Sequence, residues 1–150
     1  GDQGRKEYRQ ELENLVNKHG LGEVMRIVDH CDDMPAAFML TDVVVSASTD
    51  PEAFGRILVE AQGLGRPVVA SDHGGARETV IEGETGWLYS PGDVEALAEA
   101  LDKVLALTQE TRAQLARKAI TNVVENFSTQ AMCRKTLDVY KEVLKQKTGE

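Results

Sequence analysis

Two glutamates, Glu52 and Glu60, have the side-chain type and the spacing to serve a single ligand. Glu52 follows the apolar run 43–47, which is typical of a buried strand, and Glu60 lies in the helical segment that comes next. In open α/β sheets, ligands bind outside the carboxyl ends of the strands. The sequence therefore allows two interpretations of the pair. They form an acid–base couple, or they contact the two ends of one molecule.

The segment between the two glutamates is suited to a phosphate group. Residues 54–56 would present the first amides of the helix, which have no partner within it, and the helix dipole is positive at that end. Gly55 would let a ligand approach the backbone closely. Glu60 lies about 8 Å further along the helix axis at 1.5 Å per residue. A nucleoside diphosphate fits this spacing, with its ribose at Glu60.

The same residues also allow a purely structural interpretation. Acidic residues are common at the starts of helices, where they interact favourably with the dipole. Glu60 could be solvated, or it could pair with Arg56, four residues earlier on the same helix face. Spacing alone leaves these alternatives open.

Apolar periodicity, turn residues and N-cap residues predict an alternation of helices and strands. The fold class is therefore α/β with a parallel sheet, and the helices after the last strand are expected to cover that sheet. The predicted strands cover residues 24–28, 43–46, 67–70 and 87–89. The predicted helices cover residues 6–19, 34–40, 54–63 and 76–80, followed by three helices that begin at Asp93, Thr108 and Ser128.

Three loops, 29–33, 46–54 and 71–75, leave the carboxyl ends of predicted strands and should converge at one edge of the sheet. Two of them contain histidines, His30 and His73, which could bind a metal with neighbouring aspartates or simply be hydrogen-bonded. Cys31 is a poor candidate nucleophile, because the carboxylates around it would raise the pKa of its thiol.

The overall composition narrows the function classes. The chain has 150 residues, a net charge of −8 and 41% hydrophobic residues, which fits one globular domain and disfavours non-specific nucleic-acid binding. No apolar run approaches the roughly 20 residues of a membrane helix. The two cysteines are far apart and form no CxxC pair, which favours free thiols in a cytosolic protein.

The segment EAFGRILVEAQGLGRPVVASDHGGARE, residues 52–78, resembles the signature of the group 1 retaining glycosyltransferases. The resemblance continues through residues 82–93 and includes Gly1-Asp2 and the Asp32-Asp33 loop. Members of this family have the GT-B fold, in which two Rossmann-like domains flank a cleft. The resemblance implies that residues 1–150 form one three-layer domain, the C-terminal nucleotide-sugar-binding domain, truncated at its N-terminal edge and without the acceptor domain.

The resemblance also implies roles for individual residues. Glu52 is expected to be the catalytic residue beside the donor sugar, and Glu60 to bind the ribose hydroxyls. No metal or other cofactor is expected, because amides, helix dipole and basic side chains neutralise the leaving diphosphate. Ala53 stands where many relatives have glycine, which limits the backbone there. The remaining donor-binding residues would act mainly through their backbone: Ala53, Phe54, Gly55 and Arg56 at the sugar and phosphates, and His30 and Cys31 at the base.

The function implied is transfer of a hexose, with retention, from a nucleoside diphosphate sugar to a glycan or glycolipid. The expected setting is bacterial cell-surface polysaccharide or lipopolysaccharide synthesis, in the cytoplasm, with peripheral association at the inner face of the membrane. The isolated chain is expected to be inactive, because the acceptor domain and the family's phosphate-binding Arg and Lys lie outside it. The alternatives are a GT-B epimerase or phosphorylase, and a non-catalytic nucleotide-binding module.

Overall fold

The computed structural model describes residues 6–148, and its contacts divide the chain into two compact units, Gly1–Met34 and Pro35–Glu150. Each unit is described by itself. The Gly1-Asp2 motif and the loop expected at the start of the chain lie outside the described residues.

In the first unit, the described residues form helix α1 (Lys6–Lys18), as the periodicity predicts. Arg9 pairs with Glu13 one turn later at 2.9 Å and also with Asp29 in the loop that follows. These two hydrogen-bonded carboxylates raise the pKa of Arg9, and the hydrogen bond to Glu13 is the largest single cause. Gly20 has φ 65°, a left-handed conformation that glycine adopts without strain and that ends the helix.

The strand predicted at residues 24–28 is wrong, because this segment forms no strand in the structure. Val24 is 82% exposed and Val28 is 66% exposed, so the apolar side chains are not covered. A strand requires a hydrogen-bonded neighbour, whereas β-branched residues supply only a preference for extended backbone. The apolar run therefore reflects composition without the pairing that would make it a strand.

The second unit contains a parallel three-stranded sheet in the order β1-β2-β3. The strands are β1 (Val44–Ser46), β2 (Val68–Ser71) and β3 (Gly86–Tyr89). Val69 of the central strand lies opposite Val45 on one side and Trp87 on the other. These three strands confirm the α/β prediction, each within one residue of its expected start.

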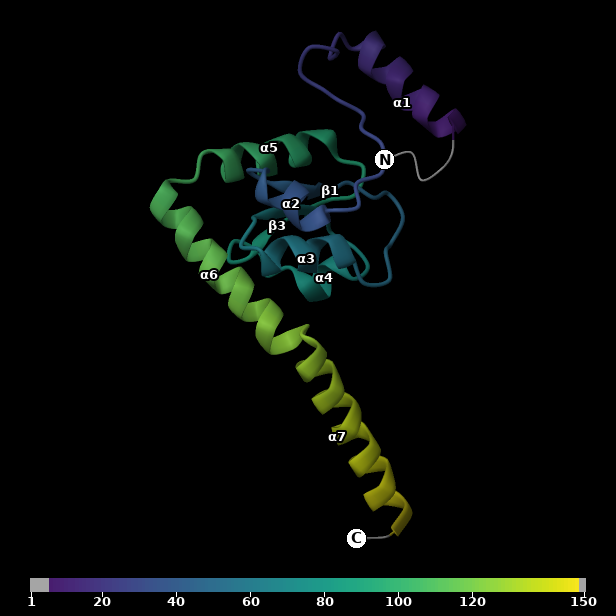
Figure 1. Ribbon diagram of the computed structural model, residues 1–150, viewed down its shortest axis with the longest axis vertical. Helices are drawn as coiled ribbons and strands as arrows, with labels where there is room; N and C mark the ends of the chain where they lie inside the picture. The colour runs from purple at the N-terminus through teal and green to yellow at the C-terminus, as the bar shows by residue number, and fades with distance from the viewer. Residues whose placement is uncertain (1–5, 149–150) are drawn as a thin grey trace. The chain divides into compact units, whose positions relative to one another are not determined.

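The sheet lies between two layers of helices. Helix α5 (Val94–Leu105) packs against β2 and β3, and helix α3 (Arg56–Gly63) packs against β1 and β2. Helix α4 (Ala76–Thr79) lies beside α3 (Figure 1). Side chains alternate along a strand, so Val69 faces α5, where it packs with Tyr89, Ala100 and Val104. Val68 and Ala70 are buried on the opposite face.

The three C-terminal helices begin where the N-cap residues predict. The Asp93 carboxylate accepts a hydrogen bond from the Ala96 amide at 2.9 Å, at the start of α5. The Thr108 hydroxyl caps α6 (Gln109–Asn126), which packs on α3, and the Ser128 hydroxyl accepts from the Ala131 amide at the start of α7 (Thr129–Thr148). Helix α2 (Met34–Met39) precedes β1 in the sequence, and its Phe38 side chain is buried.

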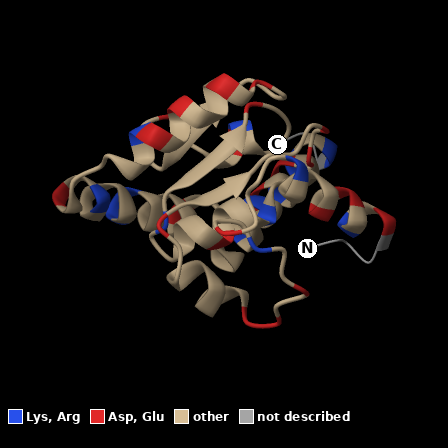
Figure 2. Cartoon of the chain, turned by 90° about the horizontal axis from the view of Figure 1, so that it is seen from above, with Lys and Arg blue, Asp and Glu red and all other residues tan. Residues whose placement is uncertain are grey.

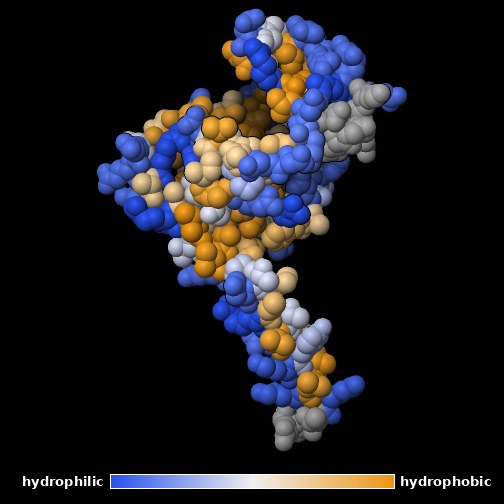
Figure 3. Space-filling view, in the orientation of Figure 1, coloured by the Kyte–Doolittle hydropathy of each residue, from blue (hydrophilic) through white to orange (hydrophobic). Residues whose placement is uncertain are grey.

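Charged residues are interspersed on the helices and loops and are absent from the three strands (Figure 2). Helix α7 leaves a series of large apolar side chains exposed (Figure 3): Met132, Leu137, Val139, Tyr140, Val143 and Leu144. Even so, none of the helices in the described part of the chain is long and apolar enough to cross a membrane.

Candidate functional site

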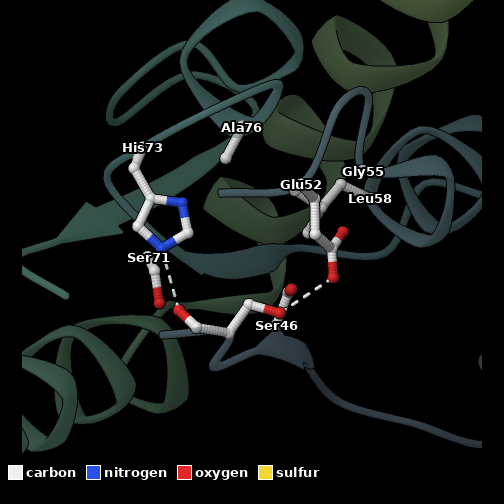
Figure 4. Close-up of a pocket in the computed structure, with 8 residues that line it drawn as sticks. Ser46, Glu52, Gly55, Leu58, Ser71, His73 and Ala76 are labelled. Carbon is white, nitrogen blue, oxygen red and sulfur yellow. Dashed lines mark hydrogen bonds between the residues drawn. The ribbon is translucent and has the colours of Figure 1, made fainter. Parts of the chain in front are cut away.

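A small pocket lies where β1 and β2 end, as the sheet topology predicts. It encloses about 10 Å³, the room of roughly one water molecule. Figure 4 shows Glu52 and His73 on opposite sides of this pocket, from two different loops. Its lining residues are Ser46, Ser48, Glu52, Gly55, Leu58, Ser71, His73 and Ala76.

Two of the three loops expected to converge do so, and glycine makes their contact possible. The Gly75 amide donates to the Glu52 carbonyl oxygen at 2.8 Å. A Cβ atom on Gly74 would lie 2.4 Å from that same carbonyl oxygen, and one on Gly75 would lie 2.5 Å from the Phe54 backbone. Only residues without a side chain permit this approach, so the two glycines fix the position of the Glu52 backbone.

The Glu52 side chain is held within its own loop. Its Oε1 atom accepts a hydrogen bond from the Ser48 hydroxyl at 2.9 Å, and the residue is exposed to solvent. The Ser48 carbonyl oxygen in turn accepts from Nε2 of His73 at 2.9 Å. Sequence reasoning missed Ser48 entirely. Its position four residues before Glu52 in a loop gave no periodic signal that could have identified it.

Helix α3 begins at Arg56, two residues later than predicted, because Gly55 adopts a left-handed conformation with φ 72° and ψ 53°. This start differs from those of α5 and α6, which have a side-chain cap and an acidic residue in the first turn. Helix α3 has neither, and its first residue is an arginine. Its first amides and the positive end of its dipole are therefore available to an anion.

Glu60 forms the ion pair with Arg56 that the sequence left open as an alternative. Oε1 of Glu60 lies 2.8 Å from Nε of Arg56, and the two side chains are 39% and 84% exposed. An exposed pair at this spacing contributes only about 0.3–0.5 kcal/mol to stability. The pair orients the Glu60 carboxylate along α3 without burying it, so the carboxylate remains accessible to a hydroxyl donor.

The remaining predicted donor-binding residues fall into two groups. Ala53 and Phe54 lie in the loop before α3, and the Phe54 ring packs edge-to-face on Phe127 at 5.9 Å between centroids. Phe127 therefore holds this loop to the end of α6, a role that sequence reasoning missed. His30 and Cys31 belong to the first unit, where His30 pairs with Asp32 at 3.2 Å and the Cys31 thiol donates to the Asp33 carbonyl. Their contact with a base stays a prediction.

The histidine-based metal site has no support in the described part of the chain. No group of three or more His, Cys, Asp or Glu side chains there could hold a metal ion. The expectation that the reaction needs no metal is untested by this observation.

Comparison with known proteins supplies the family. The model of the family described as "Glycosyl transferases group 1" matches residues 3–122. This chain belongs to the group 1 glycosyl transferases. The match includes both glutamates, the glycine pair and the three strands of the second unit.

Curated relatives differ in what they make. The chain is 36% identical to the glycogen synthase of Mycobacterium tuberculosis over 143 residues, which are 93% of this chain and 33% of that enzyme. It is 32% identical to the capsular polysaccharide biosynthesis glycosyltransferase CapM of Staphylococcus aureus over 126 residues, which are 83% of this chain and 32% of the relative. The chain therefore spans about a third of the length of these proteins.

Solved structures of GT-B glycosyltransferases confirm the fold class. A glycosyltransferase from Rickettsia africae superposes with a TM-score of 0.88 at 33% identity, covering 97% of this chain and 39% of that one. The Anabaena protein HepE, solved in complex with UDP-glucose, superposes with a TM-score of 0.83 at 29% identity, covering 93% and 38%.

Replacing Gly75 by alanine tests the contact between the two loops. The added Cβ would meet the Phe54 backbone, so we expect Gly75→Ala to lower the free energy of unfolding by roughly 1–3 kcal/mol, as overpacking does. Gly63→Ala is the matched control, because its Cβ would make an ordinary 3.5 Å contact with Val123. Urea denaturation of the two variants provides the measurement. Equal stability of Gly75→Ala and the parent chain would show that the loops are not held by this approach.

Proposed function

We propose that this chain is the donor-binding domain of a retaining glycosyltransferase, which moves a hexosyl group from a nucleoside diphosphate sugar to a glycan or glycolipid. The observation that carries the proposal is the start of α3. The helix begins with Gly55 and Arg56, without a side-chain cap or an acidic residue in its first turn. This start lies between Glu52 and Glu60 in the sequence. The likeness to HepE, whose solved complex contains UDP-glucose, supports a sugar nucleotide as the donor.

Each residue has a distinct role in this proposal. The amides at the start of α3 and the Arg56 side chain stabilise the negative charge that develops on the leaving diphosphate. The Glu52 carboxylate lies beside the donor sugar and stabilises positive charge on the ring as its bond to the diphosphate breaks. Glu60 accepts hydrogen bonds from the ribose hydroxyls. Backbone groups of Ala53, Phe54 and Gly55 contact the sugar and phosphates, and His30 and Cys31 contact the base.

The acceptor belongs to the same proposal. We assign it to cell-surface polysaccharide or lipopolysaccharide synthesis on the cytoplasmic side of the bacterial membrane, and CapM, a capsular enzyme by name, supports this class. Glycogen synthase among the relatives makes an intracellular glucan the competing acceptor. The reaction is expected to need no metal ion, since the helix start and Arg56 carry the charge stabilisation.

Nucleotide binding tests the role of Glu60. We expect Glu60→Ala to weaken binding of the preferred nucleotide among UDP, GDP and ADP by roughly tenfold, because it removes a charged acceptor of ribose hydroxyls. Isothermal titration of the isolated chain provides the measurement. Glu99→Ala, an exposed glutamate on α5, is the control and should bind like the parent. If Glu60→Ala retained full affinity, the glutamate would serve only its ion pair with Arg56.

Turnover tests the role of Glu52. In the full-length transferase, Glu52→Gln keeps an acceptor for the Ser48 hydroxyl but removes the charge, and we expect kcat to fall roughly 10²–10³-fold. Asp50→Asn, an exposed acid in the same loop, is the matched control and should leave kcat unchanged. The isolated chain should show no transfer at all. Undiminished turnover by Glu52→Gln would remove Glu52 from the reaction.

A further inference from the structure

One hydrogen bond identifies which ring nitrogen of His73 carries a proton. Nε2 of His73 lies 2.9 Å from the Ser48 carbonyl oxygen, which can only accept. The proton of the neutral ring is therefore on Nε2, and Nδ1 carries a lone pair. Nδ1 is buried and has no hydrogen-bond partner among the described residues. A buried acceptor left unpaired is unfavourable, so this atom requires a donor from outside the chain.

The neighbouring hydroxyl groups do not supply that donor. The Ser48 hydroxyl donates to Glu52, and the Ser71 hydroxyl donates to the Tyr89 hydroxyl at 3.1 Å. Together with the proton on Nε2 of His73, three of the donors around the pocket are thus directed to other protein atoms. Two acceptors remain at the pocket: the buried, unpaired Nδ1 on the His73 side and the Glu52 carboxylate on the other (Figure 4).

We propose that His73 determines donor-sugar specificity, with Nδ1 accepting a hydrogen bond from one sugar hydroxyl that enters this pocket. The pocket is small, about 10 Å³, and a single hydroxyl is the size of group that suits it. An unpaired acceptor requires a ligand group that carries a donor, and a sugar hydroxyl is such a group. This inference rests on the proposed function and adds a residue that discriminates between sugars.

His73→Gln separates this role from a merely structural one. A glutamine side chain can place its amide nitrogen near the position of Nε2 and keep the bond to Ser48, but it supplies no acceptor at the position of Nδ1. We expect His73→Gln to bind UDP, GDP and ADP like the parent chain. Its affinity for the sugar nucleotide that the parent prefers among UDP-glucose, GDP-mannose and ADP-glucose should fall roughly tenfold, the effect of one hydrogen bond. Isothermal titration provides both measurements.

Monodeoxy analogues of that sugar nucleotide provide the decisive cycle. One analogue lacks the hydroxyl that enters the pocket. The parent chain should bind this analogue roughly tenfold more weakly than it binds the intact sugar nucleotide. His73→Gln should bind the same analogue no worse than the parent does. The specificity role would be overturned if His73→Gln bound the intact sugar nucleotide as tightly as the parent does. It would also be overturned if the substitution weakened the binding of every analogue by the same factor. If the parent bound none of the three nucleotides, the proposed function itself would fail, and this inference with it. Binding of nucleotide but no tighter binding of any sugar nucleotide would overturn the inference alone.

Discussion

The site depends on one close approach of two backbones, where the amide of Gly75 meets the carbonyl oxygen of Glu52 at 2.8 Å. Each of these residues lies in a loop that follows a strand, and parallel pairing of β1 with β2 brings the two strand ends to the same edge. The approach leaves no space for side chains at Gly74 and Gly75. Because Glu52 is held by its backbone, its carboxylate is free to be oriented by Ser48 and to face the pocket.

A second consequence of this contact is the chemistry of the pocket. Holding the loops together aligns Nε2 of His73 with the Ser48 carbonyl oxygen and leaves Nδ1 without a partner. The close approach at the glycine pair therefore affects which nitrogen of His73 is left with an unpaired lone pair. In the described part of the chain, His73 does not belong to any group of three or more His, Cys, Asp or Glu side chains that could hold a metal ion.

Sequence reasoning predicted the features that local rules determine, and its errors arose where distant contacts decide. The β-branched runs at β1 and β2 and the N-caps at Asp93 and Thr108 can be recognised in the sequence, because burial and capping each require a local residue pattern. The run at 24–28 is also rich in β-branched residues, but a strand exists only with a neighbour. Gly55 was expected to permit close approach. Its left-handed φ, which delays the start of α3, depends on how the loop packs.

The start of α3 departs from the rules that stabilise helices, and the departure is informative. Arg56 in the first turn is unfavourable with the helix dipole, and Gly55 supplies no side-chain cap. The helices α5 and α6 of the same unit follow both rules, so the chain has no general shortage of capping residues. Local rules are broken most often where a ligand completes the interaction. A bound diphosphate would satisfy the free amides and the Arg56 charge together, and it would lie between the two glutamates, with Glu52 on the proposed sugar side and Glu60 on the proposed ribose side.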